Sequence, residues 1–254
     1  MYTQVADGVH RLTKGIANFY LIEEGAKLVL VDAGTPKDWT LFAQAVRALG
    51  HRVEDLDAVL LTHAHADHTG FAEQARTTTG ARVWLHQADE EMARTGKAAA
   101  SNEAGVTSYL LKGQLYKTFW VLARGGATKI IPIRELSTFG DGETLDVPGR
   151  PRVVHAPGHT AGSAVLLVEG SAVLLVEGSS ALFAGDVLCT HNPLTGRIGP
   201  QIMPSGLNRD SQQAIRSLDN LSGVKADVVL AGHGDPWTGG VGEAIRLAKA
   251  AGTS

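Results

Sequence analysis

The most informative stretch of the sequence is Thr62-His63-Ala64-His65-Ala66-Asp67-His68. It directly follows the apolar run 58–61. Three imidazoles and one carboxylate, those of His63, His65, Asp67 and His68, fall within these few residues. Side chains of this kind in one loop repel one another or lack partners unless a cation collects them. We therefore predict a metal site where a buried strand ends.

Three later segments repeat this setting, because an apolar strand pattern runs in turn into His159, Asp186 and His233. Each of these residues directly follows a glycine, which lets the backbone approach closely. A strand end also supplies the rigidity that a site needs. We expect these three side chains to join the first cluster.

The rest of the pattern indicates an α/β chain in one domain, 1–254. An opening strand meander gives way to strands alternating with helices. The expected strands cover 9–12, 17–22, 27–32, 58–61, 82–86 and 129–133, and the expected helices cover 38–49 and 71–79.

Composition narrows the choice of partners and compartment. The chain has 254 residues, a formal net charge of −3 and no basic stripe, so nucleic acid is not expected to bind. No segment is apolar for the roughly 18 residues that a membrane helix needs, so no membrane partner is expected. The only cysteine, Cys189, cannot form an intramolecular disulfide. We expect a cytoplasmic protein, monomeric or homodimeric, that acts on a small molecule.

Residues 87–125 suggest a helical, cap-like insertion whose aromatic side chains recur at helical spacing. Such a stripe is either ordinary core or the lining of a substrate pocket, since small-molecule sites are mostly apolar. The loop 187–203 is a second candidate wall. The pocket candidates from these segments are Tyr109, Tyr116, Phe119, Trp120, His191 and Met203.

The ligand-type residues together resemble the metallo-β-lactamase fold superfamily of hydrolases. The matching motifs are His63-x-His65-x-Asp67-His68, Gly158-His159-Thr160-x-Gly162, Gly185-Asp186 and Gly232-His233-Gly234. They occur in the family's order and span nearly the whole chain. The resemblance implies an αββα sandwich, in which two mixed β-sheets pack face to face with helices outside.

The resemblance also implies a ligand set. His63, His65 and His159 would hold one metal, Asp67, His68 and His233 a second, and Asp186 would bridge both. This mixture of nitrogen and oxygen suits two Zn²⁺ ions, although Mn²⁺ or Fe can occupy such sites. A bridging hydroxide would attack the substrate, with Asp67 and His68 as catalytic residues and Asp67, or a bound water, passing a proton to the leaving group.

Asp32, in the loop after the strand at 27–32, has two interpretations. It either orients a ligand histidine from behind or is an ordinary turn aspartate.

Within the superfamily, Asp186, His68 and His233 resemble the glyoxalase II, lactonase and phosphodiesterase branches more than the β-lactamases, so β-lactamase activity is expected to be weak at most. Glyoxalase II enzymes usually carry basic residues after the Gly-Asp motif, and 187–192 carries none. A quorum-quenching lactonase or carboxylesterase is therefore the first choice, with a thioesterase or phosphodiesterase as the alternative.

Two other classes of function stay open. Persulfide dioxygenases share much of the ligand pattern but bind a single iron. A non-catalytic binding module that kept the fold would not need all seven ligands.

A tandem duplication has no counterpart in the resemblance, because residues 163–170 are repeated without change as 171–178. Eight is an even number, so an inserted copy keeps each side chain on its original face of a strand. The extra copy could lengthen a hairpin, loop out, or form an exposed strand that pairs with another chain. We predict the longer hairpin.

Overall fold

The computed structural model describes residues 2–98, 101, 103, 105–169 and 180–253. Its strands form two mixed sheets and a short ribbon. The first sheet has seven strands in chain order: β1 (Tyr2–Ala6), β2 (Val9–Thr13), β3 (Asn18–Glu24), β4 (Lys27–Val31), β5 (Leu56–Leu60), β6 (Arg82–His86) and β7 (Ser137–Phe139). Strands β1 to β4 pair antiparallel, and β4 to β7 pair parallel.

The second sheet has the strand order β13-β10-β9-β8. Its strands are β8 (Arg152–His155), β9 (Ala164–Glu169), β10 (Ser180–Gly185) and β13 (Val228–Ala231). Here β10 runs parallel to β13 and antiparallel to β9, which also pairs antiparallel with β8. Strands β11 (Cys189–His191) and β12 (Ile198–Gln201) form the separate ribbon.

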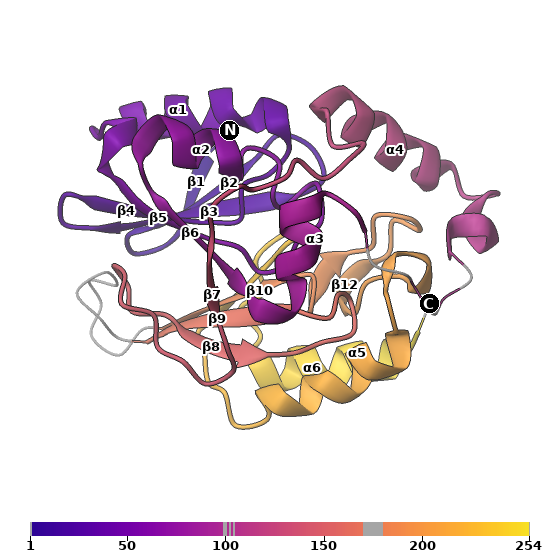
Figure 1. Ribbon diagram of the computed structural model, residues 1–254. Coiled ribbons are helices and arrows are strands. Elements are labelled where there is room, and N and C mark those ends of the chain that lie inside the picture. The colour runs from indigo at the N-terminus through magenta and orange to yellow at the C-terminus, as the bar shows by residue number, and fades with distance from the viewer. Residues whose placement is uncertain (1, 99–100, 102, 104, 170–179, 254) are drawn as a thin grey trace.

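Helices cover the outer faces of both sheets (Figure 1). Helices α1 (Trp39–Ala48) and α2 (Ala72–Thr79) lie over the first sheet, and α5 (Ser211–Ser217) and α6 (Val241–Ala251) lie under the second. The predicted αββα sandwich is therefore confirmed. No helix of the described residues is long and apolar enough to cross a membrane.

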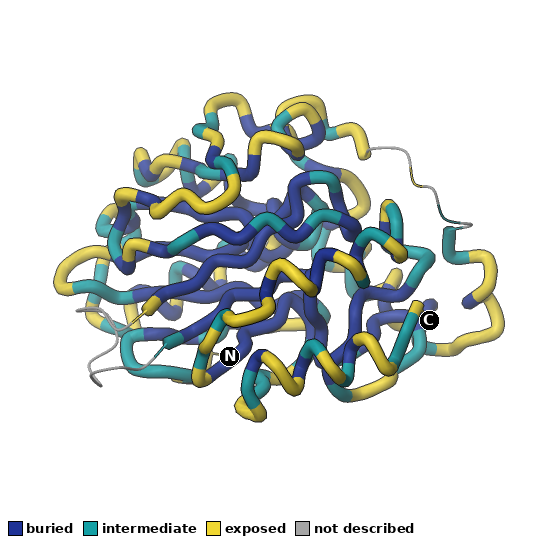
Figure 2. The backbone as a smooth tube through the Cα atoms, turned by 90° about the horizontal axis from the view of Figure 1, so that it is seen from below, coloured by how far each residue is buried: buried dark blue, intermediate teal, exposed yellow. Residues whose placement is uncertain are grey.

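Side-chain alternation along the strands builds this layering. Leu21 and Leu30 point to the core beneath α1 and α2, whereas their neighbours Tyr20, Ile22 and Val29 point to the core between the sheets. Successive side chains of a strand face opposite ways, so each buried strand serves two cores. Figure 2 shows the result, with the strands almost continuously buried and the helices exposed along their outer sides.

Within 87–125 the described residues form η3 (Gln87–Asp89), α3 (Glu90–Thr95), η4 (Gly105–Tyr109) and α4 (Gly113–Gly125). Helix α4 stands at the edge of the molecule, apart from the layers of the sandwich (Figure 1). The prediction of a strand at 129–133 was wrong, since these residues form no strand. Pro132 lacks a backbone donor, and the Ile133 amide donates to the Ala93 carbonyl instead of to a strand.

The first copy of the duplicated segment is almost entirely β9, which lies between β8 and β10 and is buried along most of its length. The second copy, 171–178, lies outside the described residues, so the predicted hairpin stays a prediction.

Candidate metal centre

Four strand ends deliver the candidate ligands to one place. The loop 62–68 follows β5, and His159 lies in the loop after β8. Strands β10 and β13 run parallel, so Asp186 and His233 emerge at the same edge of the second sheet. A Cβ added to Gly232 would lie 2.2 Å from the Asp186 Oδ1 atom. Glycine at that position therefore allows the two loops to approach.

Four of the candidate imidazoles surround the Asp186 carboxylate. Its Oδ2 atom lies 3.2 Å from Nε2 of both His159 and His233, and its Oδ1 atom lies 3.4 Å from Nε2 of His68. Nε2 of His63 is 3.8 Å from Oδ2. Asp186 is thus central to the cluster, as a bridging carboxylate would be.

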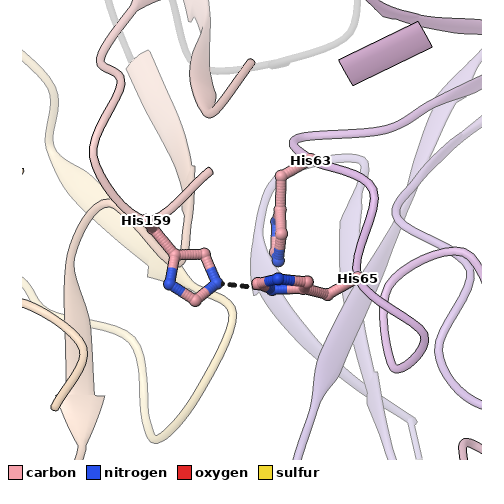
Figure 3. A group of neighbouring side chains, drawn as sticks. All are labelled: His63, His65 and His159. Atoms are coloured by element: carbon pink, nitrogen blue, oxygen red, sulfur yellow. Dashed lines mark hydrogen bonds between the residues drawn. The ribbon is translucent and has the colours of Figure 1, made fainter. Parts of the chain in front are cut away.

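The candidates fall into overlapping groups of possible ligands, one of which joins His63, His68 and Asp186. His63, His65 and His159 form another group, and Nδ1 of His65 lies 2.8 Å from Nε2 of His159 (Figure 3). Asp67, His68 and His233 form a third. In each group the possible ligand atoms lie within 4.8 Å of one another. The structure therefore assembles the two sets that the resemblance implies.

Hydrogen bonds at the far nitrogen fix the orientation of several imidazoles. His68 contacts the Asp32 carboxylate through Nδ1 at 2.8 Å, and His233 contacts the Ile16 carbonyl through Nδ1 at 3.0 Å. His159 Nδ1 lies 3.0 Å from the side-chain oxygen of Asn208. Such partners hold the ring so that Nε2 faces the cluster. The interpretation of Asp32 as an orienting residue fits this geometry.

Two positioning residues, Asn208 and Asp89, were missed by the sequence analysis. Buried Asp89 accepts hydrogen bonds from the Ala64 amide at 3.0 Å, the Thr160 hydroxyl at 2.7 Å and the Gly162 amide at 2.7 Å. It thereby ties the loop of His63 to the loop of His159. Its place just after the strand at 82–86, at the same sheet edge as 62–68, was the available signal.

Electrostatics leaves most of the cluster ready to accept a cation. Burial, together with neighbouring imidazoles, lowers the pKa of His63 well below its usual value and that of His65 to about 3. Burial opposes charge on His68 too, but nearby carboxylates, with Asp186 foremost, raise its pKa to about 10. Burial alone would raise the pKa of Asp186, but His233 and His68 hold it well below the usual range. Asp186 thus stays a carboxylate and His63 and His65 stay neutral, whereas the carboxylates favour a proton on His68 and on His233, which a bound cation would displace.

Unpartnered polar atoms test whether a metal fits here. Among the described residues, the buried side-chain atoms without a hydrogen-bond partner include Nε2 of His63, His68 and His233 and Oδ1 of Asp186. Buried polar groups are rarely left unpaired. All four atoms belong to the cluster, and nitrogen and oxygen donors are what Zn²⁺ and similar ions bind. The residues therefore fit a site for divalent metal ions.

Comparison with known proteins decides the family. The model of the metallo-beta-lactamase superfamily matches residues 12–233. The chain belongs to this superfamily. Probable metallo-hydrolase YflN of Bacillus subtilis (strain 168) is 28% identical over 255 residues, covering 93% of this chain and 87% of that protein. Uncharacterized protein Rv2581c of Mycobacterium tuberculosis (strain ATCC 25618 / H37Rv) is 29% identical over 227 residues, covering 87% of each chain.

Solved structures show the superfamily fold as well. Rm3 metallo-beta-lactamase matches with a TM-score of 0.73 at 15% identity, covering 98% of this chain and 91% of that one. A B3 metallo-beta-lactamase with an active-site glutamic acid matches with a TM-score of 0.68 at 23% identity, covering 99% of this chain and 90% of that one. At these identities the likeness concerns the fold alone.

A cavity of about 490 Å³, called the metal-facing cavity below, opens onto the cluster of candidate metal ligands. His65, Asp67, His159, Asp186 and His233 lie in its wall, which is otherwise largely apolar. Two of the six predicted pocket residues, Phe119 and Met203, also line it.

The structure places the other four pocket candidates elsewhere. Tyr109 is buried against Leu115 and Leu194, so it packs as core, and its hydroxyl pairs with Ser205. Tyr116 and Trp120 are turned outward on α4, with 59% and 62% of their surface exposed. His191 lines a separate depression together with Arg11 and Asp235. None of these four lines the metal-facing cavity, so their part in a substrate pocket stays a prediction.

Proposed function

We propose that the protein is a binuclear metal-dependent hydrolase of a small ester or lactone. The observation that carries this proposal is the position of the candidate ligands in the wall of a cavity lined mainly by apolar side chains. Its volume of about 490 Å³ falls within the range of small-molecule sites. An uncharged acyl chain or lactone ring suits such a wall.

Two metal ions are supported by the second group of donors. A single-iron dioxygenase would need two histidines and a carboxylate, which His63, His159 and Asp186 could supply. That alternative leaves Asp67, His68 and His233 without a purpose, although they meet within 4.8 Å and His68 is held by Asp32. We favour zinc for both positions.

When bound, such ions would lower the pKa of a water molecule and polarise the oxygen of a substrate carbonyl. The chain's own residues do the rest. Asp186 remains a carboxylate between the two donor groups, and the pinned imidazoles hold their geometry without rearrangement. Asp67, whose side chain is 17% exposed, faces the cavity and lies 3.6 Å from His233. In this scheme it passes a proton to the leaving group.

We propose that β-lactamase activity is weak at most. The chain carries Asp186 where many enzymes of that activity have a cysteine or lack the bridging carboxylate. The similarity to solved β-lactamases concerns the fold.

Metal analysis followed by a substrate panel tests the proposal. Purified protein, loaded separately with zinc, manganese and iron, is assayed on a lactone, an aryl ester, a thioester, a phosphodiester and a β-lactam. We expect two zinc ions per chain and the highest kcat/KM on the lactone or the ester. D186N should abolish both binding and hydrolysis, whereas D146N, at a fully exposed carboxylate, should change neither. One iron per chain with oxygen uptake on glutathione persulfide would overturn the proposal.

A further inference from the structure

A second cavity, of about 560 Å³, lies along another flank of helix α4. Phe119 faces the metal-facing cavity, whereas Trp120, Val121 and Arg124 face the second one. Both cavities share Ile16 and Leu122 in their walls. They are therefore neighbours separated by a ridge that these two residues form.

The second cavity is basic. Lys14 comes from the turn between β2 and β3, Lys37 from the turn before α1, and Arg124 from the end of α4. None of the three takes part in an ion pair with any residue that the structure describes. The Arg124 guanidinium lies over the Trp120 ring, 5.2 Å from its centroid, which limits the positions of that side chain.

The only carboxylate in the wall is already engaged. Oδ2 of Asp38 accepts hydrogen bonds from the Thr35 amide at 2.8 Å and the Thr35 hydroxyl at 2.7 Å, and the residue is buried. It cannot turn towards the lysines without leaving those two donors unpaired. The exposed cations of the cavity therefore lack an acidic partner of their own.

The surroundings reinforce this charge. Residues 104–134 include five lysines and arginines and no aspartate or glutamate, in a chain whose net charge is −3. Clustered charge of one sign concentrates oppositely charged ligands at a cleft. A largely apolar cavity, which has the metal cluster and Lys129 in its wall, thus adjoins a basic cavity.

We propose that the second cavity binds a negatively charged group of the substrate, a carboxylate or a phosphate, while the scissile carbonyl lies in the metal-facing cavity. The proposal rests on the hydrolase function proposed above. It names the substrate class as an acyl ester or thioester with an anionic end several bonds from the reacting carbon. Lys14, Lys37 and Arg124 would supply the basic grip that 187–192 lacks.

Equilibrium binding tests the anion site without hydrolysis. The probes are 8-(dansylamino)octanoic acid and its uncharged amide, titrated by fluorescence in EDTA. We expect the acid to bind at least about tenfold more tightly than the amide, since each exposed pair contributes modestly and three act together. K14Q/K37Q/R124Q should reduce that preference to about twofold. Benzoate and phenyl phosphate as competitors distinguish a carboxylate site from a phosphate site.

Lys225→Gln is the matched control, because Lys225 is an exposed lysine on the far layer with no ion pair among the described residues. It should keep the full preference for the acid. Raising the salt concentration should weaken binding of the acid but not of the amide. Equal binding of both probes, or a preference that survives in the triple variant, overturns the proposal. The single variants K14Q and K37Q serve as a check should the triple variant misfold.

Kinetics on a matched pair completes the test with the zinc-loaded protein. Mono-4-nitrophenyl suberate and 4-nitrophenyl octanoate differ only in the terminal carboxylate. We expect kcat/KM to favour the suberate about tenfold, and the triple variant to lose that ratio. If the acid probe is preferred but neither ester is hydrolysed, the hydrolase function fails and the anion site stands. If both esters react equally and neither probe is preferred, the proposal of an anion site is refuted and the hydrolase function stands.

Discussion

The Asp32 carboxylate lies 2.8 Å from Nδ1 of His68, behind the candidate metal cluster. Asp32 adopts the left-handed region with φ at 60°, which is uncommon for a residue other than glycine. Its other oxygen, Oδ1, accepts a hydrogen bond from the Thr62 amide at 2.8 Å. One strained residue thus joins the loop after β4 to the loop of ligands after β5. Strain of this kind persists where surrounding contacts enforce it.

Replacing Asp32 should therefore weaken metal binding. In D32A the His68 ring loses the partner that holds Nε2 towards Asp186. We expect zinc affinity at the group of Asp67, His68 and His233 to fall about 10- to 100-fold. Competition with a chromophoric chelator measures this, with D146N as an exposed control. Unchanged zinc affinity in D32A would refute the orienting role.

Replacement of Asp89 should lower the stability of the protein. D89A leaves three buried donors, those of Ala64, Thr160 and Gly162, without their acceptor. We expect the free energy of unfolding to fall by about 3 kcal/mol. Urea denaturation in EDTA measures folding apart from metal binding. Half-buried Asp57, which pairs with exposed Lys27 at the surface, offers the comparison: D57A should cost under about 1 kcal/mol. If D89A and D57A lost equal amounts of stability, Asp89 would not hold the loop of His63 to the loop of His159.

Local patterns in the sequence placed the candidate ligands at strand ends, whereas the sandwich followed from the family resemblance. His63 to His68 occupy one loop, and strands β4 and β10 show apolar runs directly. Asn208 and Asp89 escaped notice because their partners are distant in the chain: Asp89 contacts Thr160 71 residues away. No pattern of spacing identifies such a contact.

Of the three pocket candidates on α4, only Phe119 lines the metal-facing cavity. Helical spacing shows which side chains share a face, but not which way that face is turned. Phe119 points to the metal-facing cavity, whereas Tyr116 and Trp120 face outward. The rotation of α4 about its axis depends on the residues against which it packs. Gly15 leaves room for close contact with Val121, and Gly125 leaves room for close contact with Thr35.

Gly70 predicts that a single methyl group disturbs the ligand loop. A Cβ at this position would lie 2.4 Å from the Gly34 carbonyl oxygen and 2.4 Å from the Thr35 carbonyl carbon. Both are backbone atoms, so the neighbours cannot easily move. We expect G70A to destabilise the protein by about 1 to 3 kcal/mol. Thermal unfolding measures it, and G113A is the matched control.

Gly113 lies at the exposed start of α4 with no atom within 4 Å of an added Cβ. Alanine favours helix, so G113A should leave the melting temperature unchanged or slightly higher. A G70A protein as stable as G113A would show that the loops 34–36 and 68–71 adjust freely.

His86 predicts a loss of stability in acid. Its ring stacks on His155 with 3.9 Å between centroids, and burial, then the charge of His155, lowers the pKa of His86 to about 4. The unfolded chain takes up this proton near pH 6.5, before the folded protein does. The contribution to stability is therefore complete above pH 6.5 and is lost as the pH falls towards 4, by at most about 3 kcal/mol.

The measurement compares wild type with H86N by urea denaturation in EDTA between pH 8 and 4. Asparagine retains an acceptor for the Ala88 amide, which His86 Nδ1 binds at 3.2 Å, but does not titrate. H86N should lose less stability in acid than wild type. Parallel pH profiles for the two proteins would exclude His86 as a source of the acid sensitivity.

Phe119 predicts a selective effect on long acyl chains. Its ring lines the metal-facing cavity, so F119A removes apolar surface that an acyl chain would contact. Loss of such a contact costs about 1 kcal/mol, and we expect KM for 4-nitrophenyl octanoate to rise about fivefold. KM for 4-nitrophenyl acetate should hardly change, because its acyl group is too short to reach the ring. Tyr116, one turn earlier on α4, lines neither cavity and bonds to the Leu110 carbonyl, so Y116A should leave both KM values unchanged. If F119A raised KM equally for both esters, or if Y116A matched it, the acyl chain would lie elsewhere.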